Sequence, residues 1–588
     1  MRASLSTCIL LICLLSGLLS VSATATEPPE LVISGIEGDA LKNVRLILEL
    51  PYGLVRDGRV VDLLWLERFA RQAEQEVRTA LEPFGYYHPI VTIHSEARDK
   101  DAYRLLVQIE PGRQTVVNEV KVILEGPGAH EKQLRRLAAA FPLKQGGALL
   151  HLDYEQAKSS LQAQAIDLGY LDATFLRNEI RVSDDESRAD VYLTLATGEK
   201  YRFDGVTIRG APDYPDEFLR RYLTFASGDI FSYAKLGETQ QNFSGSERFK
   251  QVLITPEVGK AMDLKVPVQI QLIPAPHRTL RPGIGYGTDT GARLTLRFRD
   301  LNAFQLGHEY DAQLFLAERL QGFATAYTIP SPRDIRSNYL LQFNVQREDI
   351  SSYVSRLIAL EAAANRSFGT KELGTVYLKL QQEEFTIAGH ESNSRLVLPG
   401  LRFSSNHYNN LLRPNRGFRY ALELRGSHQV MGSDTALLQA LAEGGYLLPL
   451  PGRLSLNLRG KTATTMLSDP LSEIPTSLRF FAGGDQSIRG YSYKSLGPKD
   501  ASGKVVGGKN LLIGSVELEQ ALFEKWGVSV FYDAGNAFNT FDKVKIYQGA
   551  GVGLHYYSQV GALNLSLARQ IGNGRSNYHL HFTVGFEF

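Results

Sequence analysis

The second half of the chain alternates apolar and polar residues with a period of two, and this pattern limits the folds that the chain can adopt. The segments Leu341–Gln346, Phe418–Arg425 and Leu454–Arg459 place Leu, Phe, Tyr or Val at nearly every second position, mostly with Arg, Glu, Gln or Asn between them. Successive side chains of a β-strand point to opposite faces of its sheet. Each segment therefore predicts a strand with one apolar face and one strongly polar face.

Two architectures produce such strands, a soluble β-sandwich and a membrane-spanning β-barrel. Arg and Glu recur on the polar face of nearly every segment, which suits a barrel with lipid outside and water inside better than a sandwich. About sixteen candidate strands lie in two groups, from Arg281 to Thr464 and from Asn510 to Phe588. Single-chain bacterial barrels have an even number of strands of ~10 residues, so we predict an all-β sixteen-stranded transmembrane barrel.

The first half of the chain has a different pattern, in which amphipathic helical segments alternate with short strands. The pairs Gly85-Tyr86 and Gly169-Tyr170 each follow a helical stripe, and about 85 residues separate them. A third unit of the same order ends near Pro276. The spacing predicts three α+β repeats of β-α-α-β-β order, residues 26–112, 113–198 and 199–276, before a barrel at 277–588. One large irregular α/β domain is the alternative.

The first 25 residues have the features of an export signal. Arg2 precedes the apolar run Cys8–Leu15, and the small residues of Ala23-Thr24-Ala25 form a cleavage site. We predict a secretory signal peptide, residues 1–25, with a short buried helix as the alternative. Both cysteines of the chain fall within it, so the mature chain is expected to have no disulfide and no Cys-ligated metal.

Charge and motifs exclude several classes of function. The balance of 64 Lys+Arg against 63 Asp+Glu gives no basic footprint, so nucleic acid is not an expected partner. The sequence has no Gly-x-Ser-x-Gly elbow, no His-Glu-x-x-His helix and no phosphate loop. The repeated glycines of Gly283–Gly287 and Gly549–Gly553 have strand spacing rather than dinucleotide-loop spacing. We therefore expect a protein that is not an enzyme and has no cofactor or metal site.

The longest gap between candidate strands, Thr465–Lys509, contains the tripeptide Arg489-Gly490-Tyr491. A later strand carries Phe531, Asp533 and Gly535 at alternate positions, so these three residues share one face. That face points into the lumen if the remaining alternate residues face lipid, namely Val528, Val530 and Tyr532.

These two motifs complement each other chemically. An arginine that enters a barrel needs acceptors, because an unpaired charge away from bulk water is costly. Asp533 on the inner wall would supply them, Phe531 could stack on the guanidinium, and Gly535 would leave space for the loop. A solvated loop arginine is the alternative for Arg489.

With these motifs, the chain resembles the outer-membrane assembly superfamily that includes BamA, TamA and the two-partner secretion transporters. Members of this superfamily carry POTRA repeats before a sixteen-stranded barrel, and their sixth extracellular loop places an Arg-Gly-Tyr/Phe tip on a Phe-x-Asp-x-Gly strand. The resemblance covers the whole mature chain. It implies a lumen lock for the loop, made of Arg489, Gly490, Tyr491, Phe531, Asp533 and Gly535.

Within this superfamily, the presence of three repeats is similar to the TamA branch. TamA proteins are the outer-membrane subunit of the translocation and assembly module. This resemblance implies a Gram-negative outer membrane as the location, with the POTRA repeats in the periplasm. It implies a TamB-like inner-membrane-anchored partner, contact with outer-membrane lipid, and unfolded outer-membrane proteins or autotransporters as clients. A two-partner-type secretion pore for one dedicated exoprotein is the alternative.

The first and last candidate strands predict a lateral seam. Pro282 lacks a backbone donor, and a glycine-rich strand is weakly registered. Client strands could add to an edge exposed there. Ordinary barrel curvature is the alternative, because glycines also relieve crowding in a lumen. The residues of the predicted seam are Pro282, Gly283, Gly285, Gly287, Gly585, Phe586 and Phe588.

Overall fold

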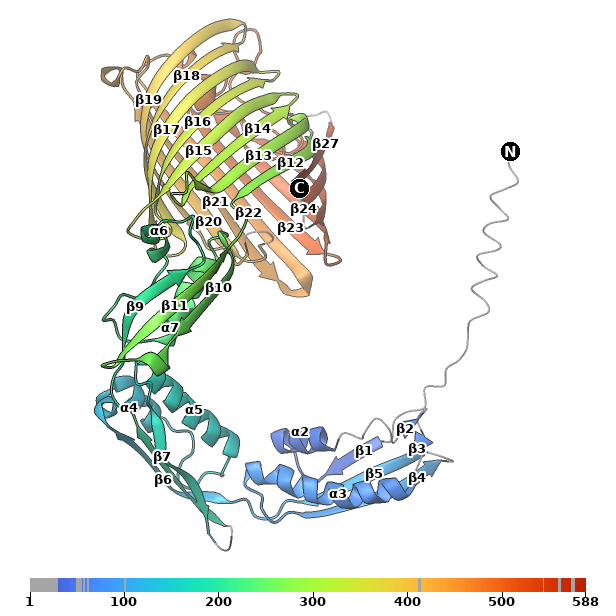
Figure 1. Ribbon diagram of the computed structural model, residues 1–588. Helices are drawn as coiled ribbons and strands as arrows, with labels where there is room; N and C mark the ends of the chain where they lie inside the picture. The colour runs from blue at the N-terminus through green and yellow to red at the C-terminus, as the bar shows by residue number, and fades with distance from the viewer. Residues whose placement is uncertain are drawn as a thin grey trace, which may run out of the picture. The chain divides into compact units, whose positions relative to one another are not determined.

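The computed structural model describes residues 30–48, 55–56, 59–60, 63–99, 102–183, 185, 187–410, 414–542, 544–558, 562–572 and 577–587. The predicted signal peptide, residues 1–25, and Phe588 of the predicted seam lie outside these residues. Three α/β sheets with their helices precede a closed all-antiparallel barrel of sixteen strands (Figure 1), which confirms the predicted fold class. Among the described residues, no helix is long and apolar enough to cross a membrane.

The first repeat places two helices on a three-stranded sheet. Its central strand β5 (Ala102–Glu110) runs parallel to β1 (Glu30–Ser34) and antiparallel to β4 (Ile90–Asp99). Ala73, Val77 and Leu81 recur every fourth residue and are fully buried, so one stripe of the long helix forms the core. The remaining elements are α2 (Gly38–Ile47), β2 (Val55–Arg56), β3 (Arg59–Val60) and α3 (Leu63–Leu81).

The second repeat has the same topology, with β8 in the middle, parallel to β6 and antiparallel to β7. Gly169 has a φ of +94° directly after the last helix, a left-handed conformation that favours glycine, and it ends the helix there. Leu134, Leu161 and Leu193 are fully buried between the helices and the sheet. The elements are β6 (Val116–Glu125), α4 (Lys132–Ala139), α5 (His151–Asp167), β7 (Thr174–Val182) and β8 (Arg188–Ala196).

The third repeat contains the division between two compact units of the chain. Of the described residues, those within 30–205, 225–236 and 256–268 form one unit, and those within 206–224, 237–255 and 269–587 form the other. Within the second unit, the rings of Tyr222, Phe243 and Phe249 pack against one another. The sheet order is β10-β11-β9. The elements are β9 (Arg202–Arg209), α6 (Asp216–Arg220), α7 (Tyr233–Ser244), β10 (Phe249–Pro256) and β11 (Lys265–Pro274).

The barrel has eleven strands, a long connection and then five strands, in the two groups that the sequence predicts. Every strand pairs antiparallel with its neighbour in sequence, and β12 pairs with β27 to close the sheet. The strands are β12 (Arg278–Gly287), β13 (Gly291–Ala303), β14 (His308–Ala317), β15 (Leu320–Pro330), β16 (Asn338–Asp349), β17 (Tyr353–Phe368), β18 (Glu372–Ile387), β19 (His390–Asn406), β20 (Gly417–Ser427), β21 (Leu437–Leu450), β22 (Leu454–Leu467), β23 (Asn510–Ala521), β24 (Trp526–Phe538), β25 (Tyr547–Tyr557), β26 (Ala562–Ile571) and β27 (Tyr578–Glu587).

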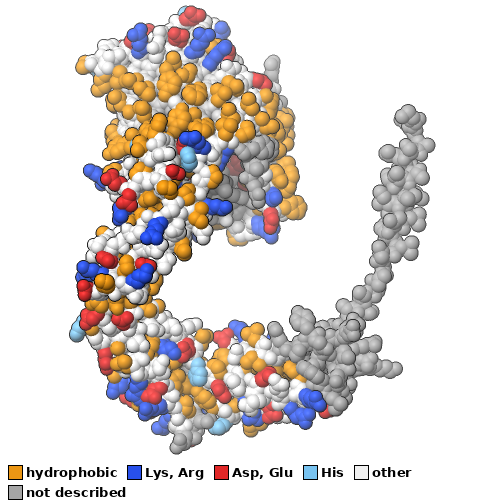
Figure 2. Space-filling view, in the orientation of Figure 1, with side chains coloured by type: hydrophobic (Ala, Val, Ile, Leu, Met, Phe, Trp, Pro, Cys, Tyr) orange, Lys and Arg blue, Asp and Glu red, His pale blue; other side chains and the backbone are white. Residues whose placement is uncertain are grey.

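The alternation in sequence becomes an alternation of faces. On β24, Val530 and Tyr532 are exposed on the outer surface, whereas Phe531 and Asp533 are buried inside. Figure 2 shows hydrophobic side chains covering the visible outer wall of the barrel, with charged side chains gathered at its upper rim. The outer face of the barrel is thus apolar and its inner face polar, as the sequence predicts.

Contacts inside the second unit place its own segments of the third repeat, residues 206–224 and 237–255, beside the turns that follow even-numbered barrel strands. Arg248 donates from Nε to the Leu301 carbonyl at 3.2 Å, at the end of the second strand. Arg221 donates to the Asp334 carbonyl at 2.9 Å, in the turn after the fourth strand. The connection after the eleventh strand, residues 468–509, therefore lies at the opposite end of the barrel wall.

Candidate functional site in the barrel lumen

Residues 468–509, here called the lumen loop, connect β22 to β23 and enter the barrel. The loop bonds to inner-face side chains of strands that lie far apart around the wall. The Glu383 carboxylate on β18 accepts from the backbone N–H of Ser477 at 3.2 Å. The Nζ of Lys494 donates to both oxygens of Glu348 on β16, at 2.8 and 3.0 Å. The lumen loop is therefore fixed at several points around the wall.

The loop arginine and the strand aspartate of the predicted lock form a bidentate ion pair. Arg489 donates from Nε to Asp533 Oδ2 at 2.7 Å and from a terminal nitrogen to Oδ1 at 2.9 Å. Its backbone N–H also donates to Asp533 Oδ2 at 3.0 Å. Arg489 is 5% exposed and Asp533 is fully buried, so little water is available to replace either partner.

A second carboxylate completes the site, and sequence reasoning missed it. Glu517 on β23 accepts from the other terminal nitrogen of Arg489 at 2.9 Å. Glu517 lies directly opposite Phe531 in the β23–β24 ladder, and the Phe531 ring centroid is 3.4 Å from the guanidinium carbon. The sequence did contain a signal for Glu517, because it is an acidic residue on the polar face of β23, the neighbour of the strand that carries Asp533.

The ionic partners keep Arg489 charged in spite of its burial. Removal from water favours the neutral form, but hydrogen bonds and the negative charges of Asp533 and Glu517 outweigh that effect and raise the pKa of Arg489. A guanidinium with two carboxylates and a flat ring around it is held in one orientation. The arrangement therefore fixes the position of the loop.

Gly490 and Tyr491 extend the docked segment along the inner wall. The Gly490 N–H donates to Nε2 of His581 on β27 at 2.9 Å, and its carbonyl accepts from Gln570 on β26 at 2.8 Å. Tyr491 is buried, and its ring meets that of Tyr547 edge-on at 5.5 Å. The structure thus joins five strands, β23 to β27, to one short segment of the loop.

Two glycines near the docked loop are closely packed, one against a neighbouring strand and the other against the loop. A Cβ placed at Gly535 would lie 2.2 Å from the carbonyl oxygen of Leu512, which belongs to the neighbouring strand and not to the loop. A Cβ at Gly549 on β25 would lie only 1.9 Å from the Arg489 carbonyl oxygen. The atoms nearest to Gly535 thus belong to β23, whereas Gly549 provides a close approach of the loop backbone.

The predicted seam is closed in this structure but has a short ladder. Five pairs join β12 to β27 among the described residues, from Gly283 opposite Glu587 to Gly287 opposite Thr583. The ladder from β12 to its other neighbour, β13, has ten pairs. Gly285 faces Gly585, and Ile284 faces Phe586. Pro282 lies before the first described pair of the seam, opposite Leu296 of β13.

A model of the Omp85 superfamily domain matches residues 281–588, which is more than half of the chain. The chain belongs to the Omp85 superfamily. A model of the first POTRA domain of TamA also matches residues 30–111, the first repeat. The predicted family resemblance is thereby confirmed, with a TamA-type POTRA domain before the Omp85 barrel.

One curated protein and two solved structures are also similar to this chain. The curated outer membrane protein assembly factor BamA of Nitratidesulfovibrio vulgaris is 23% identical over 435 residues, which cover 70% of this chain and 53% of that protein. The Omp85 chain thus spans about half the length of the curated relative it matches. The crystal structure of BamA from Haemophilus ducreyi lacking POTRA domains 1-3 aligns with a TM-score of 0.68 and 17% identity, over 80% of this chain and 100% of that chain. CdiB from Acinetobacter baumannii aligns at a TM-score of 0.46 and 15% identity, over 81% and 90%.

Proposed function

We propose that this Omp85 chain is a TamA-like outer-membrane assembly factor. It inserts or translocates autotransporters and other β-barrel proteins by strand addition at the seam between the first and last barrel strands. The barrel lies in the outer membrane of a Gram-negative bacterium with the POTRA repeats in the periplasm. Outer-membrane lipid contacts the apolar wall, and an inner-membrane-anchored TamB-like protein is the partner.

The short seam carries this proposal. Five described pairs hold β12 to β27, three of the β12 residues in them are glycines, and Pro282 precedes them. Separating these two strands breaks fewer backbone hydrogen bonds than opening the β12–β13 ladder would. A separated strand presents unpaired N–H and C=O groups, and an incoming client strand can pair with them.

Two observations support the TamA type within the superfamily. The first repeat matches the TamA model for that position, and three repeats precede the barrel. Each repeat sheet has two edge strands, and strand addition at such an edge is a common way to bind an extended segment. The repeats would offer these edges to clients or to the TamB-like partner.

A disulfide across the seam tests the function. Tyr286 and Val584 are paired across the seam, and the chain's own cysteines lie in the predicted signal peptide. In proteoliposomes with an unfolded autotransporter barrel, the oxidised Tyr286→Cys/Val584→Cys protein should assemble clients at the rate of empty vesicles. Reduction should restore assembly, as measured by heat-modifiable gel mobility.

A matched pair controls for oxidation and for loss of a lipid-facing side chain. Leu422 and Ala442 are paired between β20 and β21, away from the seam. A disulfide between cysteines at these positions should leave assembly unchanged. Full assembly with the seam oxidised would contradict the proposal. High open-pore conductance of the purified chain, without client assembly, would favour the secretion pore instead.

A further inference from the structure

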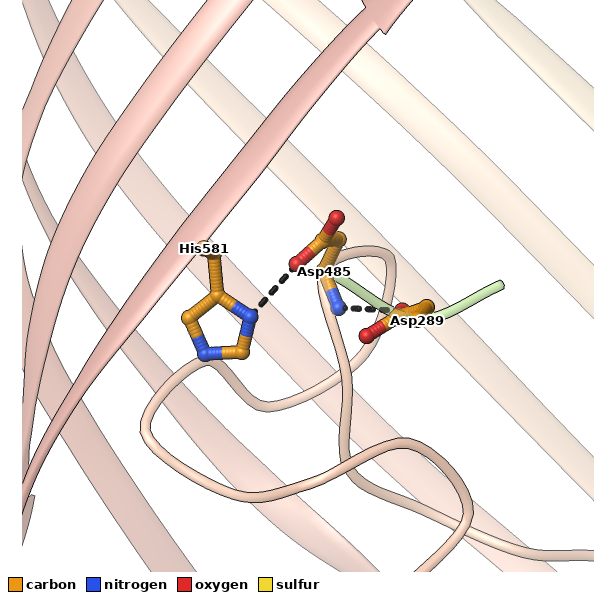
Figure 3. Close-up of side chains that lie close together, drawn as sticks. All are labelled: Asp289, Asp485 and His581. Atoms are coloured by element: carbon orange, nitrogen blue, oxygen red, sulfur yellow. Dashed lines mark hydrogen bonds and ion pairs between the residues drawn. The ribbon is translucent and has the colours of Figure 1, made fainter. Parts of the chain in front are cut away.

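One residue of the lumen loop contacts both strands of the seam. Figure 3 shows Asp485 between Asp289, which lies in the turn after β12, and His581 on β27. The Asp485 backbone N–H donates to Asp289 Oδ2 at 2.9 Å. The Asp485 carboxylate accepts from the Thr583 hydroxyl of β27 at 2.7 Å and from the Thr288 hydroxyl, next to Asp289, at 3.4 Å. A single side chain and its own amide thus connect the two edges.

These contacts lie where the seam ladder ends. The last described pair is Gly287 with Thr583, and the Thr288 N–H then donates to the Phe582 carbonyl at 3.0 Å. Asp485 bonds at this same end, so opening the seam from there first requires the Asp485 contacts to break. One added hydrogen bond is a larger fraction of the closing free energy of a ladder of five pairs than of a long ladder, because the short ladder has fewer hydrogen bonds in total.

Asp289, Asp485 and His581 have the residue types of a cation site, but the hydrogen bond that the His581 ring accepts argues against one. His581 Nε2 receives the Gly490 N–H, so this nitrogen carries the lone pair. In the neutral ring the proton is then on Nδ1, which lies 2.5 Å from Asp485 Oδ1. A protonated Nδ1 cannot bind a metal ion. The cluster is therefore held by the hydrogen bonds of Asp485 and by the close contact of its carboxylate with a neutral imidazole.

The same histidine connects this cluster to the lumen lock. His581 faces Asp485 through one ring nitrogen and Gly490 through the other, and Gly490 directly follows Arg489. The ring is 6% exposed, so both contacts lie away from bulk water. The ion pair of Arg489 with Asp533 thereby sets where the loop lies, and Asp485 transmits that position to the seam.

We propose that Asp485 is a positioning residue that holds the end of the seam beside Thr288 and Thr583 closed while the lumen loop is docked. The contact of Asp485 with Asp289, His581, Thr288 and Thr583 is here called the seam clasp. The inference deepens the proposed function, because client strands would add at this seam. It can be tested without clients, so failure of the clasp and failure of client assembly are separate results.

The test measures amide hydrogen exchange of the full chain in lipid nanodiscs. Asp485→Ala should increase exchange of amides in 283–287 and 583–587 about tenfold or more, the factor that loss of ~1.4 kcal/mol of closing free energy produces. Amides of β24 around Asp533 should keep their wild-type rates, because the lock does not depend on Asp485. Asp485→Asn should fall between wild type and alanine, since it keeps one acceptor oxygen.

Asp500→Ala is the matched control. Asp500 lies in the same loop, and its carboxylate accepts hydrogen bonds from its loop neighbours Ser502 and Lys504. This variant should leave seam exchange unchanged. Wild-type seam exchange in Asp485→Ala would overturn the proposal, as would equal increases at the seam and around Asp533, which would indicate general undocking. Seam exchange that slows with Zn²⁺ and recovers with a chelator would overturn the hydrogen-bonded form of the clasp.

Discussion

Arg489 and Asp533 form a buried bidentate ion pair although 44 positions separate them in the chain. The pair joins a loop to the inner wall of a barrel, and Glu517 and Phe531 enclose the same guanidinium. Removing one partner of a buried pair leaves the other charge without compensation, which costs more than the pair itself contributes. A single substitution at either residue of this pair should therefore destabilise the barrel.

Replacing the loop arginine should destabilise the folded barrel. We expect Arg489→Ala to lower the unfolding free energy by ~3–5 kcal/mol, the usual result of breaking a buried ion pair. Arg489→Lys should recover only part of this loss, because an ammonium cannot form the bidentate fork to Asp533. Urea unfolding followed by heat-modifiable gel mobility measures both variants.

The control for charge removal is Arg347→Ala. Arg347 pairs with Asp349 at 3.0 Å, and both side chains are 49% exposed, so the loss should be below ~1 kcal/mol. An Arg489→Ala barrel as stable as Arg347→Ala would contradict the buried lock.

A single methyl group at Gly549 should displace the loop. A Cβ there would lie 1.9 Å from the Arg489 carbonyl oxygen, which is backbone and cannot rotate away. We expect Gly549→Ala to increase protease cleavage within 468–509 several-fold. Gly514→Ala on β23 is the control, because no atom lies within 4 Å of a Cβ at that position. Equal cleavage of the two variants would show that the loop does not pack on Gly549.

Glu517 should matter less than Asp533, although both contact Arg489. Glu517 accepts once from Arg489 and also from Ser529 at 2.6 Å, whereas Asp533 accepts three bonds from Arg489. Each hydrogen bond to a charged group contributes ~1.5–3 kcal/mol, so we expect a smaller loss for Glu517→Gln than for Asp533→Asn. The same urea series measures it, and the reverse order would reassign the main acceptor of Arg489.

The seam should loosen as pH rises through about 6. Burial and the nearby negative charge of Asp485 raise the pKa of Asp289, which lies in a turn outside the strands, to about 6. Burial favours the neutral form of Asp485 too, but its bonds to His581 and Thr583 outweigh this effect and lower the pKa of Asp485. Asp485 therefore stays ionised through the window in which Asp289 titrates. The other groups that act on Asp289 are His581, Arg319 and Tyr493.

The sign follows from the raised value. Asp289 binds its proton more tightly when the lumen loop is docked than when it is undocked. Docking is therefore strongest below the ordinary Asp pKa of 3.8 and weakens as the pH rises to about 6. Relative to amides near Asp533, seam amides should exchange faster at about pH 7.5 than at about pH 5. Asp289→Asn should remove this difference. A difference that persists in Asp289→Asn would assign the pH dependence to another group.

Periodicity predicted the barrel well because it reports a local property. Val530 and Tyr532 alternate with Phe531 and Asp533, and a strand exposes such residues on opposite faces whatever lies beside it. The contact between Arg489 and Asp533 could also be predicted from the sequence, because a charged loop tip needs an acceptor on an inner face. Gly535 shows the limit of such prediction. Its nearest atoms belong to an adjacent strand, and the register between two strands cannot be predicted from the pattern of either one.

The sequence by itself determined the number of strands, the face that each residue occupies, and one acceptor for the loop arginine. Only the tertiary structure decided that Glu517 and His581 meet the same loop segment, and that Asp485 reaches both edges of the seam. The reason is physical: alternation is set by the geometry of each strand, whereas these contacts depend on strand register and on the path of a long loop across the lumen.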